Sequence, residues 1–172
     1  MFVDEIKLSQ HLSVTTSARI DGVVDLGPFT TEKERTLPCD HGMPIMFSPF
    51  VRKWTQILAV WATHRNMKGD LLAKVLIEAV LLAEDAGLFV DFITCDGATC
   101  NRNMWKELGI EATAQHIKSR IHHPKDRTRF LHFVSDFPHL IKCLRNNLLT
   151  HDFETRDGEV SFFMIHSAYI SI

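Results

Sequence analysis

The sequence predicts an α/β fold in which helices flank one mixed sheet of approximately five strands. Strand-like apolar runs come first and are joined by short links, which indicates an antiparallel meander. A strong helical pattern follows and then alternates with further apolar runs, an order typical of parallel strands joined by helices. With 172 residues, of which 45% are apolar and 23% charged, the chain resembles one globular domain.

The first part of the chain supplies most of the strand-like runs. Pro44 lacks an N–H group, so its run is expected at an edge of the sheet or beside it. The polar residues 30–42 are expected to form a loop. The predicted strands here are residues 1–3, 20–26, 43–47 and 55–63.

Residues 70–86 carry the clearest helical pattern, with apolar residues recurring at i, i+3 and i+4. Asp70 is expected to cap this helix, and Gly87 stands where a terminating glycine belongs. Beyond it, the predicted elements are a strand at 88–95, a helix at 101–108, a loop at 115–128, a strand at 129–134 and a helix from Asp136 to about residue 149.

Two acidic residues stand at the ends of strand-like runs far apart in the sequence. Asp4 follows the first run, and Asp96 follows the run that ends at Cys95. A single aspartate in such a place usually marks a turn or a helix cap. Carboxylates brought together from distant segments, in contrast, are how a two-metal nuclease site is built, and Mg²⁺ prefers such oxygen ligands.

Four strings carry a resemblance to a known family: DEIKL at 4–8, VDLG at 24–27, CDGATCNR at 95–102 and SDFPHLIKCLRNNL at 135–148. Together they resemble the RNase H-like domain of P-element-type transposases, a family that includes the THAP-domain transposases of animals. The resemblance implies an RNase H-like domain over residues 1–160. Residues 161–172 depart from the family as a divergent apolar tail.

The resemblance implies a nuclease domain for cut-and-paste DNA transposition, with phosphodiester hydrolysis and strand transfer supported by Mg²⁺ or Mn²⁺. It implies that Asp4 and Asp96 are the first two catalytic acids and metal ligands. The family's third acid, a Glu beyond a GTP-binding insertion, has no match here, and neither the insertion nor the THAP domain is matched. We therefore expect an incomplete domain that is inactive by itself.

The string at 135–148 contributes four further candidates for contact with DNA or for support of the metal ligands: Asp136, His139, Lys142 and Arg145. Lys142 and Arg145 lie three residues apart on one predicted helix face, where they are able to meet DNA phosphates. The simpler interpretations are a helix cap for Asp136, a structural role for His139 and a solvated face for the two cations.

Composition and motifs exclude several classes of function. A net charge of −2 gives no global attraction for nucleic acid, and no apolar stretch is long enough for a transmembrane helix. The N-terminus lacks the pattern of a secretory signal, and no P-loop for GTP is found. The four cysteines show no C-x2-C pairing, and Cys95 and Cys143 stand in apolar or helical contexts, so buried free thiols are expected there. His116, His122, His123 and Cys100 match no tetrahedral zinc spacing. The resemblance implies a nuclear protein, with transposon-end DNA and homo-oligomers as partners of the full-length form.

Three classes of function remain open from the sequence. The first is a transposase catalytic domain or a relic of one. The second is a domesticated interaction module that keeps the fold without the chemistry. The third is an unrelated α/β enzyme that uses Asp96 and His139.

Overall fold

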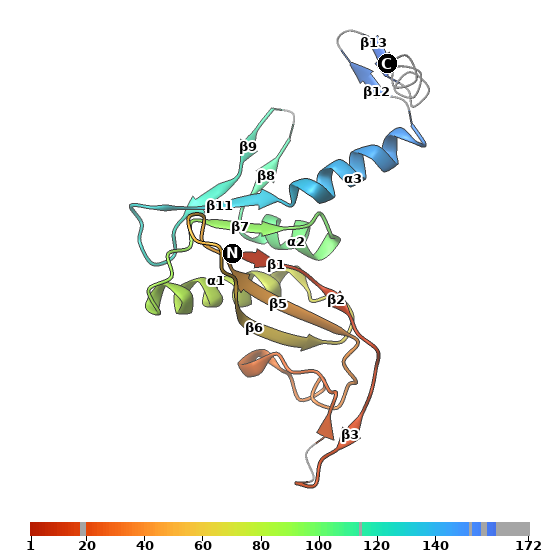
Figure 1. The fold of residues 1–172 in the computed structure, drawn as a ribbon, viewed down its shortest axis with the longest axis vertical. Helices are drawn as coiled ribbons and strands as arrows, with labels where there is room; N and C mark the ends of the chain where they lie inside the picture. The colour runs from red at the N-terminus through yellow and green to blue at the C-terminus, as the bar shows by residue number, and fades with distance from the viewer. Residues whose placement is uncertain (18–19, 114, 152, 156–157, 161–172) are drawn as a thin grey trace. The chain divides into compact units, whose positions relative to one another are not determined.

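Figure 1 shows the computed structural model of the chain, which describes residues 1–17, 20–113, 115–151, 153–155 and 158–160. Contacts divide it into two compact units, Met1–Val134 and Ser135–Ile172. The first unit contains the large sheet and two α-helices, and the second contains one helix and a hairpin.

The first unit is built on a seven-stranded mixed sheet with the order β10-β11-β7-β1-β5-β2, and β6 also pairs with β5. Its strands are β1 (Phe2–Val3), β2 (Ile6–Lys7), β5 (His41–Phe47), β6 (Gln56–Thr63), β7 (Phe92–Cys95), β10 (Arg120–His122) and β11 (Phe130–Ser135). Smaller elements are β3 (Ser13–Val14) with β4 (Ile20–Asp21), β8 (Glu111–Ala112) with β9 (Ile117–Lys118), and the 3-10 helix η1 (Gly27–Phe29).

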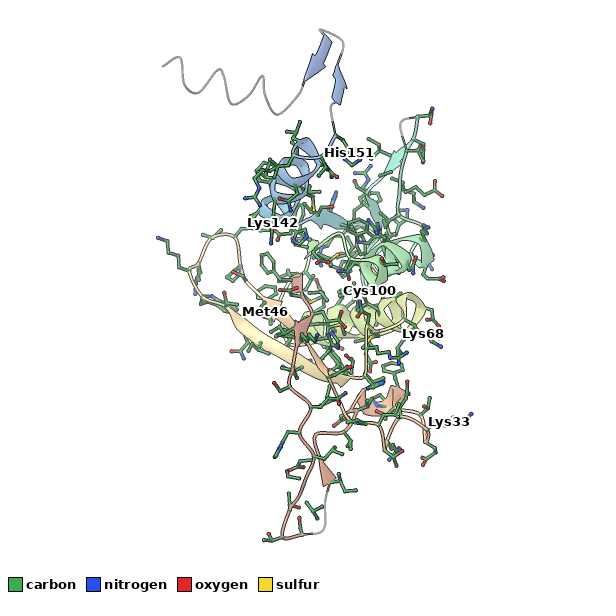
Figure 2. All side chains as sticks on the ribbon, turned by 90° about the vertical axis from the view of Figure 1, so that its right-hand side faces the viewer. Lys33, Met46, Lys68, Cys100, Lys142 and His151 are labelled. Atoms are coloured by element: carbon green, nitrogen blue, oxygen red, sulfur yellow. The ribbon has the colours of Figure 1, made fainter. Side chains whose placement is uncertain are left out.

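Two helices, α1 (Gly69–Asp85) and α2 (Thr99–Glu107), pack against each other on one face of the sheet, as Figures 1 and 2 show from two directions. The core between sheet and helices is aliphatic, and its least exposed side chains include Ile45, Leu72, Val75, Leu76, Ile93 and Leu131. The β1–β5 pairing is antiparallel and the β1–β7 pairing is parallel. The predicted mixed sheet with flanking helices is therefore confirmed.

The ends of α1 show which local predictions were right. Gly87 has φ +82° directly after the helix, as a terminating glycine requires. Asp70 is not the cap, because Lys68 occupies the N-cap position and Asp70 lies in the first turn, where its charge still favours the helix dipole. Gly69 permits close packing: a Cβ there would lie 2.6 Å from Cβ of Asn103 in α2.

The expectation that Pro44 marks an edge strand is wrong, because β5 is paired on both sides. Since proline cannot donate, its pairing with Val60 of β6 must be the non-hydrogen-bonded kind, which turns its nitrogen towards β1 and β2. The register of β1 and β2 against β5 is continuous and places Asp4 opposite Pro44. The missing N–H explains why this strand is interrupted at Asp4 and Glu5.

Several predicted boundaries also differ from the structure. The run 20–26 forms a strand only at Ile20–Asp21, and the run 88–95 only from Phe92 onwards. The predicted loop 115–128 contains β9 and β10, because β11 offers β10 an open edge that its polar sequence does not reveal. Cys95 is a buried thiol as expected and Cys100 is buried as well, but the expectation that Cys143 is buried is wrong, because it lies on an exposed part of α3 (Phe137–Leu148).

The second unit contains α3 (Phe137–Leu148) and the hairpin of β12 (Phe153–Thr155) with β13 (Gly158–Val160). Asp136 occupies the N-cap position of α3, but its side chain makes no capping hydrogen bond. Pro138 lies in the first turn, as its fixed φ favours. The predicted apolar tail, 161–172, lies outside the described residues.

Candidate functional site

The pairing of β1 with β7 brings the two predicted acids together at the carboxyl ends of two central strands. The strands are parallel, and Val3 lies opposite Cys95. Asp4 and Asp96 are the next residues on each strand, so both follow the carboxyl ends of neighbouring parallel strands. This is the edge at which α/β proteins gather their sites.

Local hydrogen bonds hold the Asp96 carboxylate. Its Oδ1 accepts from the backbone N–H of Ala98 at 2.9 Å and from Nδ2 of the buried Asn101 at 2.7 Å. Both hydrogen bonds are accepted by the same carboxylate oxygen. Ala98, the donor of one of them, is the N-cap residue of α2. The cap-like turn predicted as the simpler role of Asp96 is thus present, and it also fixes the direction of the carboxylate.

Asp4 is more exposed than Asp96, and its Oδ1 accepts from the backbone N–H of Glu5 at 2.8 Å. Strand alternation turns Asp4 to the opposite side of β1 from the buried Val3. The interruption opposite Pro44 leaves the chain free to depart from the ladder here. Asp4 therefore belongs to an accessible rim of the site.

Glu5 is a site residue that the sequence analysis missed. It is half-buried, and its Oε1 is a buried oxygen with no hydrogen-bond partner in the described structure. Loss of hydration raises the pKa of Glu5, and the nearby Asp96 carboxylate adds to this, although His41 opposes it. A hydrogen bond with the backbone of Met67 also opposes the shift, but a buried carboxylate oxygen without a partner beside other acids is still costly. The available signal was the second acid of the Asp4-Glu5 pair.

These carboxylates line a small pocket of about 110 Å³. Its walls are apolar or weakly polar and include Val3, Met43, Met67, Leu72, Ala98 and Cys100. In the part of the chain that the structure describes, no three His, Cys, Asp or Glu side chains are grouped as a ready metal cage. The carboxylate oxygens of Asp4 and Asp96 and the unpartnered Oε1 of Glu5 nevertheless fit a hard cation. Mg²⁺ is usually held by one or two carboxylates together with water and substrate phosphate.

The other four candidates belong to the second unit. Asp136 and His139 are partly exposed, and Lys142 and Arg145 are exposed on α3. Arg145 donates to the side chain of Asn146 at 2.8 Å. The pocket itself is built from the first unit alone. The roles of these four residues stay predictions.

Comparisons with known proteins now define the class of the domain. The model of the TNP-like RNase H N-terminal domain matches residues 1–109. Among solved structures, a chain of the Drosophila P element transposase strand transfer complex superposes with a TM-score of 0.72 at 23% sequence identity. The match covers 99% of this chain and 33% of that one. No curated protein gives a sequence match.

The fold is therefore RNase H-like. The chain belongs to the TNP-like RNase H N-terminal domain family, and the resemblance to P-element-type transposases is confirmed. It spans about a third of the transposase chain whose fold it shares. No helix in the described ranges is long and apolar enough to cross a membrane.

Proposed function

We propose that this chain is part of the catalytic domain of a cut-and-paste DNA transposase, in which Asp4 and Asp96 bind Mg²⁺ or Mn²⁺. The observation that carries the proposal is the parallel pairing of Val3 with Cys95, which aligns the two acids at one sheet edge. The family match supports the class of chemistry, and the pocket between the acids supports the location.

Each residue has a distinct task in this proposal. Asp96, oriented by Asn101 and the Ala98 N–H, presents its second oxygen to the cation. Asp4 supplies a carboxylate from the exposed rim, where DNA has access. Glu5 adds a negative oxygen from the buried side. Bound divalent cations would stabilise the attacking and leaving oxygens of an in-line displacement at phosphorus.

The family also supports the proposed partners and location. The solved relative is a strand transfer complex, which favours transposon-end DNA as the partner of the full-length protein. By the same reasoning the protein acts in the nucleus and as a homo-oligomer. Contact of Asp136, His139, Lys142 or Arg145 with DNA or with the metal ligands belongs to this proposal as well.

Metal titration tests the assignment. Asp96→Asn should weaken Mn²⁺ binding by at least about tenfold, because it removes a charged ligand, and the matched variant Asp136→Asn should weaken it less. Isothermal titration calorimetry on the full 172-residue chain measures both. Equal losses, or no loss in either variant, would defeat the assignment of Asp96.

A second measurement asks what the chain does alone. We expect it neither to cut nor to join transposon-end DNA with Mn²⁺. The reason is that Asp4, Asp96 and Glu5 do not include a match to the family's distant third acid. Cleavage of labelled donor DNA by the chain and by Asp4→Ala decides this. Activity that disappears in the control would show that a Glu within this chain completes the site.

A non-catalytic module that keeps the fold is the second candidate. The observation that favours it is the turn that Asp96 Oδ1 closes with the Ala98 N–H, which a purely structural aspartate would also form. This alternative would be established if calorimetry detects no heat of Mn²⁺ binding that depends on Asp4 and Asp96.

A further inference from the structure

The sheet face opposite to α1 and α2 carries a row of aromatic rings. Along β7 and β11, side chains alternate between the buried core and this outer face, with Ile93 and Leu131 pointing inwards. Five rings follow one another across the outer face, from β10, β11, β7 and the loop between β5 and β6. They are His122, Phe130, His132, Phe92 and Phe50.

The rings are close enough to form one continuous surface. The centroid of His122 lies 4.9 Å from that of Phe130, which lies 6.5 Å from His132. His132 stacks on Phe92 at 5.1 Å with 22° between the planes, and Phe92 meets the edge or face of Phe50 at 5.3 Å. Phe50 is 85% exposed, so the row ends in an open ring.

Positive charge accompanies this row. The guanidinium of Arg120 lies 4.2 Å from the ring centroid of Phe130, and Arg120 itself is exposed opposite His132. Residues 116–132 contain five Lys or Arg residues and one Asp, in a chain whose net charge is −2. Lys125 and Arg129 are paired with acids of the first unit, so Lys118, Arg120 and Arg127 carry the excess positive charge of this segment.

A hollow of about 690 Å³ adjoins the row at its Phe50 end. Aromatic side chains form much of its wall, and Arg52 stands among them. The aromatic lining residues are Phe2, Phe47, Phe50, Trp54, Phe89 and Phe92. Its volume is in the range of sites for small flat ligands, which includes an unstacked nucleobase.

We propose that this outer face, defined by His122, Phe130, His132, Phe92 and Phe50 with Arg120, binds single-stranded nucleic acid. Unpaired bases stack on aromatic rings whatever their sequence, and guanidinium groups meet the phosphates. Bases in a duplex are already stacked on one another, so the surface prefers single strands. This goes beyond the proposed transposase chemistry, since it requires neither Asp4 nor Asp96.

Fluorescence anisotropy with a labelled 15-nucleotide oligo-dT tests the proposal on the full chain. EDTA is present throughout, so failure of the metal site cannot affect the result. We expect the oligonucleotide to bind more tightly than a duplex of equal length. The double variant Phe92→Leu/Phe130→Leu keeps the surface apolar and removes stacking, so it should weaken binding by about tenfold or more.

A charge variant keeps the test decisive if the double variant is unstable. Arg120→Gln should weaken oligonucleotide binding and lower the slope of log K against log salt by about 0.7. The matched control Arg102→Gln, at an exposed position of α2, should change neither. No binding by the wild-type chain, or equal effects of Arg120→Gln and Arg102→Gln, would overturn the proposal.

A protein occupant of this face gives a different result. Apolar docking of a second copy would survive substitution by leucine and would appear as a dimer in sedimentation velocity. Oligonucleotide affinity unchanged in Phe92→Leu/Phe130→Leu, with a dimer that Phe50→Ser dissolves, would replace the nucleic acid by a second copy of the chain.

Discussion

The first unit contains two groups of carboxylates that have opposite electrostatic environments. Around Glu84, on α1, each acid meets a cation: Arg129 donates to Glu84 at 2.9 and 3.1 Å and to Asp91 at 2.7 Å. In the acidic pocket, Glu5 lies near Asp96 and its Oε1 has no partner among the described residues. One group is fully compensated by cations within the chain, and in the other His41 and a Met67 backbone hydrogen bond compensate Glu5 only in part.

The pKa shifts follow this difference. Burial alone would raise the pKa of Glu84, but hydrogen bonds from Arg129 and the Val90 N–H outweigh it and lower that pKa below its usual value. Burial raises the pKa of Glu5, and neither the charge of His41 nor the hydrogen bond with the Met67 backbone outweighs it. Structural acids are satisfied by the fold, whereas an acid left costly by the fold is a candidate for a ligand from outside.

A buried histidine completes the compensated group. His123 is 1% exposed, and its Nδ1 accepts from the backbone N–H groups of Lys125 and Asp126. The proton of the neutral ring therefore resides on Nε2, which lies 3.3 Å from Oε1 of Glu84 without good hydrogen-bond geometry. The turn between β10 and β11 is attached to the end of α1 by the ion pairs of Lys125 with Asp85 and of Arg129 with Glu84.

The largest expected effect comes from removing the cation of the compensated group. Arg129→Met should lower the free energy of unfolding by about 3 kcal/mol, because it leaves Glu84, whose side chain is 4% exposed, without its charge partner. Urea denaturation followed by circular dichroism measures the change. The substitution of the exposed Arg127, Arg127→Met, is the matched control. If Arg129→Met lowers the free energy of unfolding no more than this control does, the Arg129–Glu84 pair contributes no more than an exposed ion pair.

The two glutamates should respond to pH in opposite directions. The raised pKa of Glu5 means that its ionisation destabilises the fold, so wild-type stability due to Glu5 is full below the unfolded pKa and falls as pH rises through the folded one. The lowered pKa of Glu84 means that its contribution is present above the unfolded pKa and is lost as pH falls through the folded one.

Glutamine substitution at each position separates these contributions. At pH 7, Glu5→Gln should stabilise the chain by about 1 kcal/mol and Glu84→Gln should destabilise it by at least as much. Both differences should shrink towards pH 3. Denaturation curves between pH 3 and 7 provide the check, and the same sign for both variants would mean that the pocket is compensated after all.

The sequence predicted those elements that local patterns determine. The periodicity of 70–86 and Gly87 located α1, and the strand ends located Asp4 and Asp96 on neighbouring strands. The compensated group was out of reach because Arg129 and Glu84 are 45 residues apart, and nothing local selects that partner. Glu5 was missed because it lies in the break between β1 and β2, where no periodic pattern shows that its side chain is half-buried, and the neighbouring acid Asp4 was its one local signal.

The two prolines show the same limit. Pro138 correctly indicated the start of α3, since its effect is confined to the first turn. Pro44 was misplaced at an edge, because its tolerance in a central strand depends on which neighbour its nitrogen faces. That orientation is set by the pairing with β6, and it also explains why the chain opens at Asp4.

The smallest effect is expected at Asp136, which separates a carboxylate with a site role from one with only a helix-end position. Asp136→Asn should change the free energy of unfolding by less than about 0.5 kcal/mol, since asparagine is as good a residue at the N-cap of α3 and no side-chain capping bond is lost. Urea denaturation in EDTA and again in Mn²⁺ measures the effect. A loss that appears only with Mn²⁺ would make Asp136 a supporter of the metal ligands, and the contrast with Asp96 would then be one of degree.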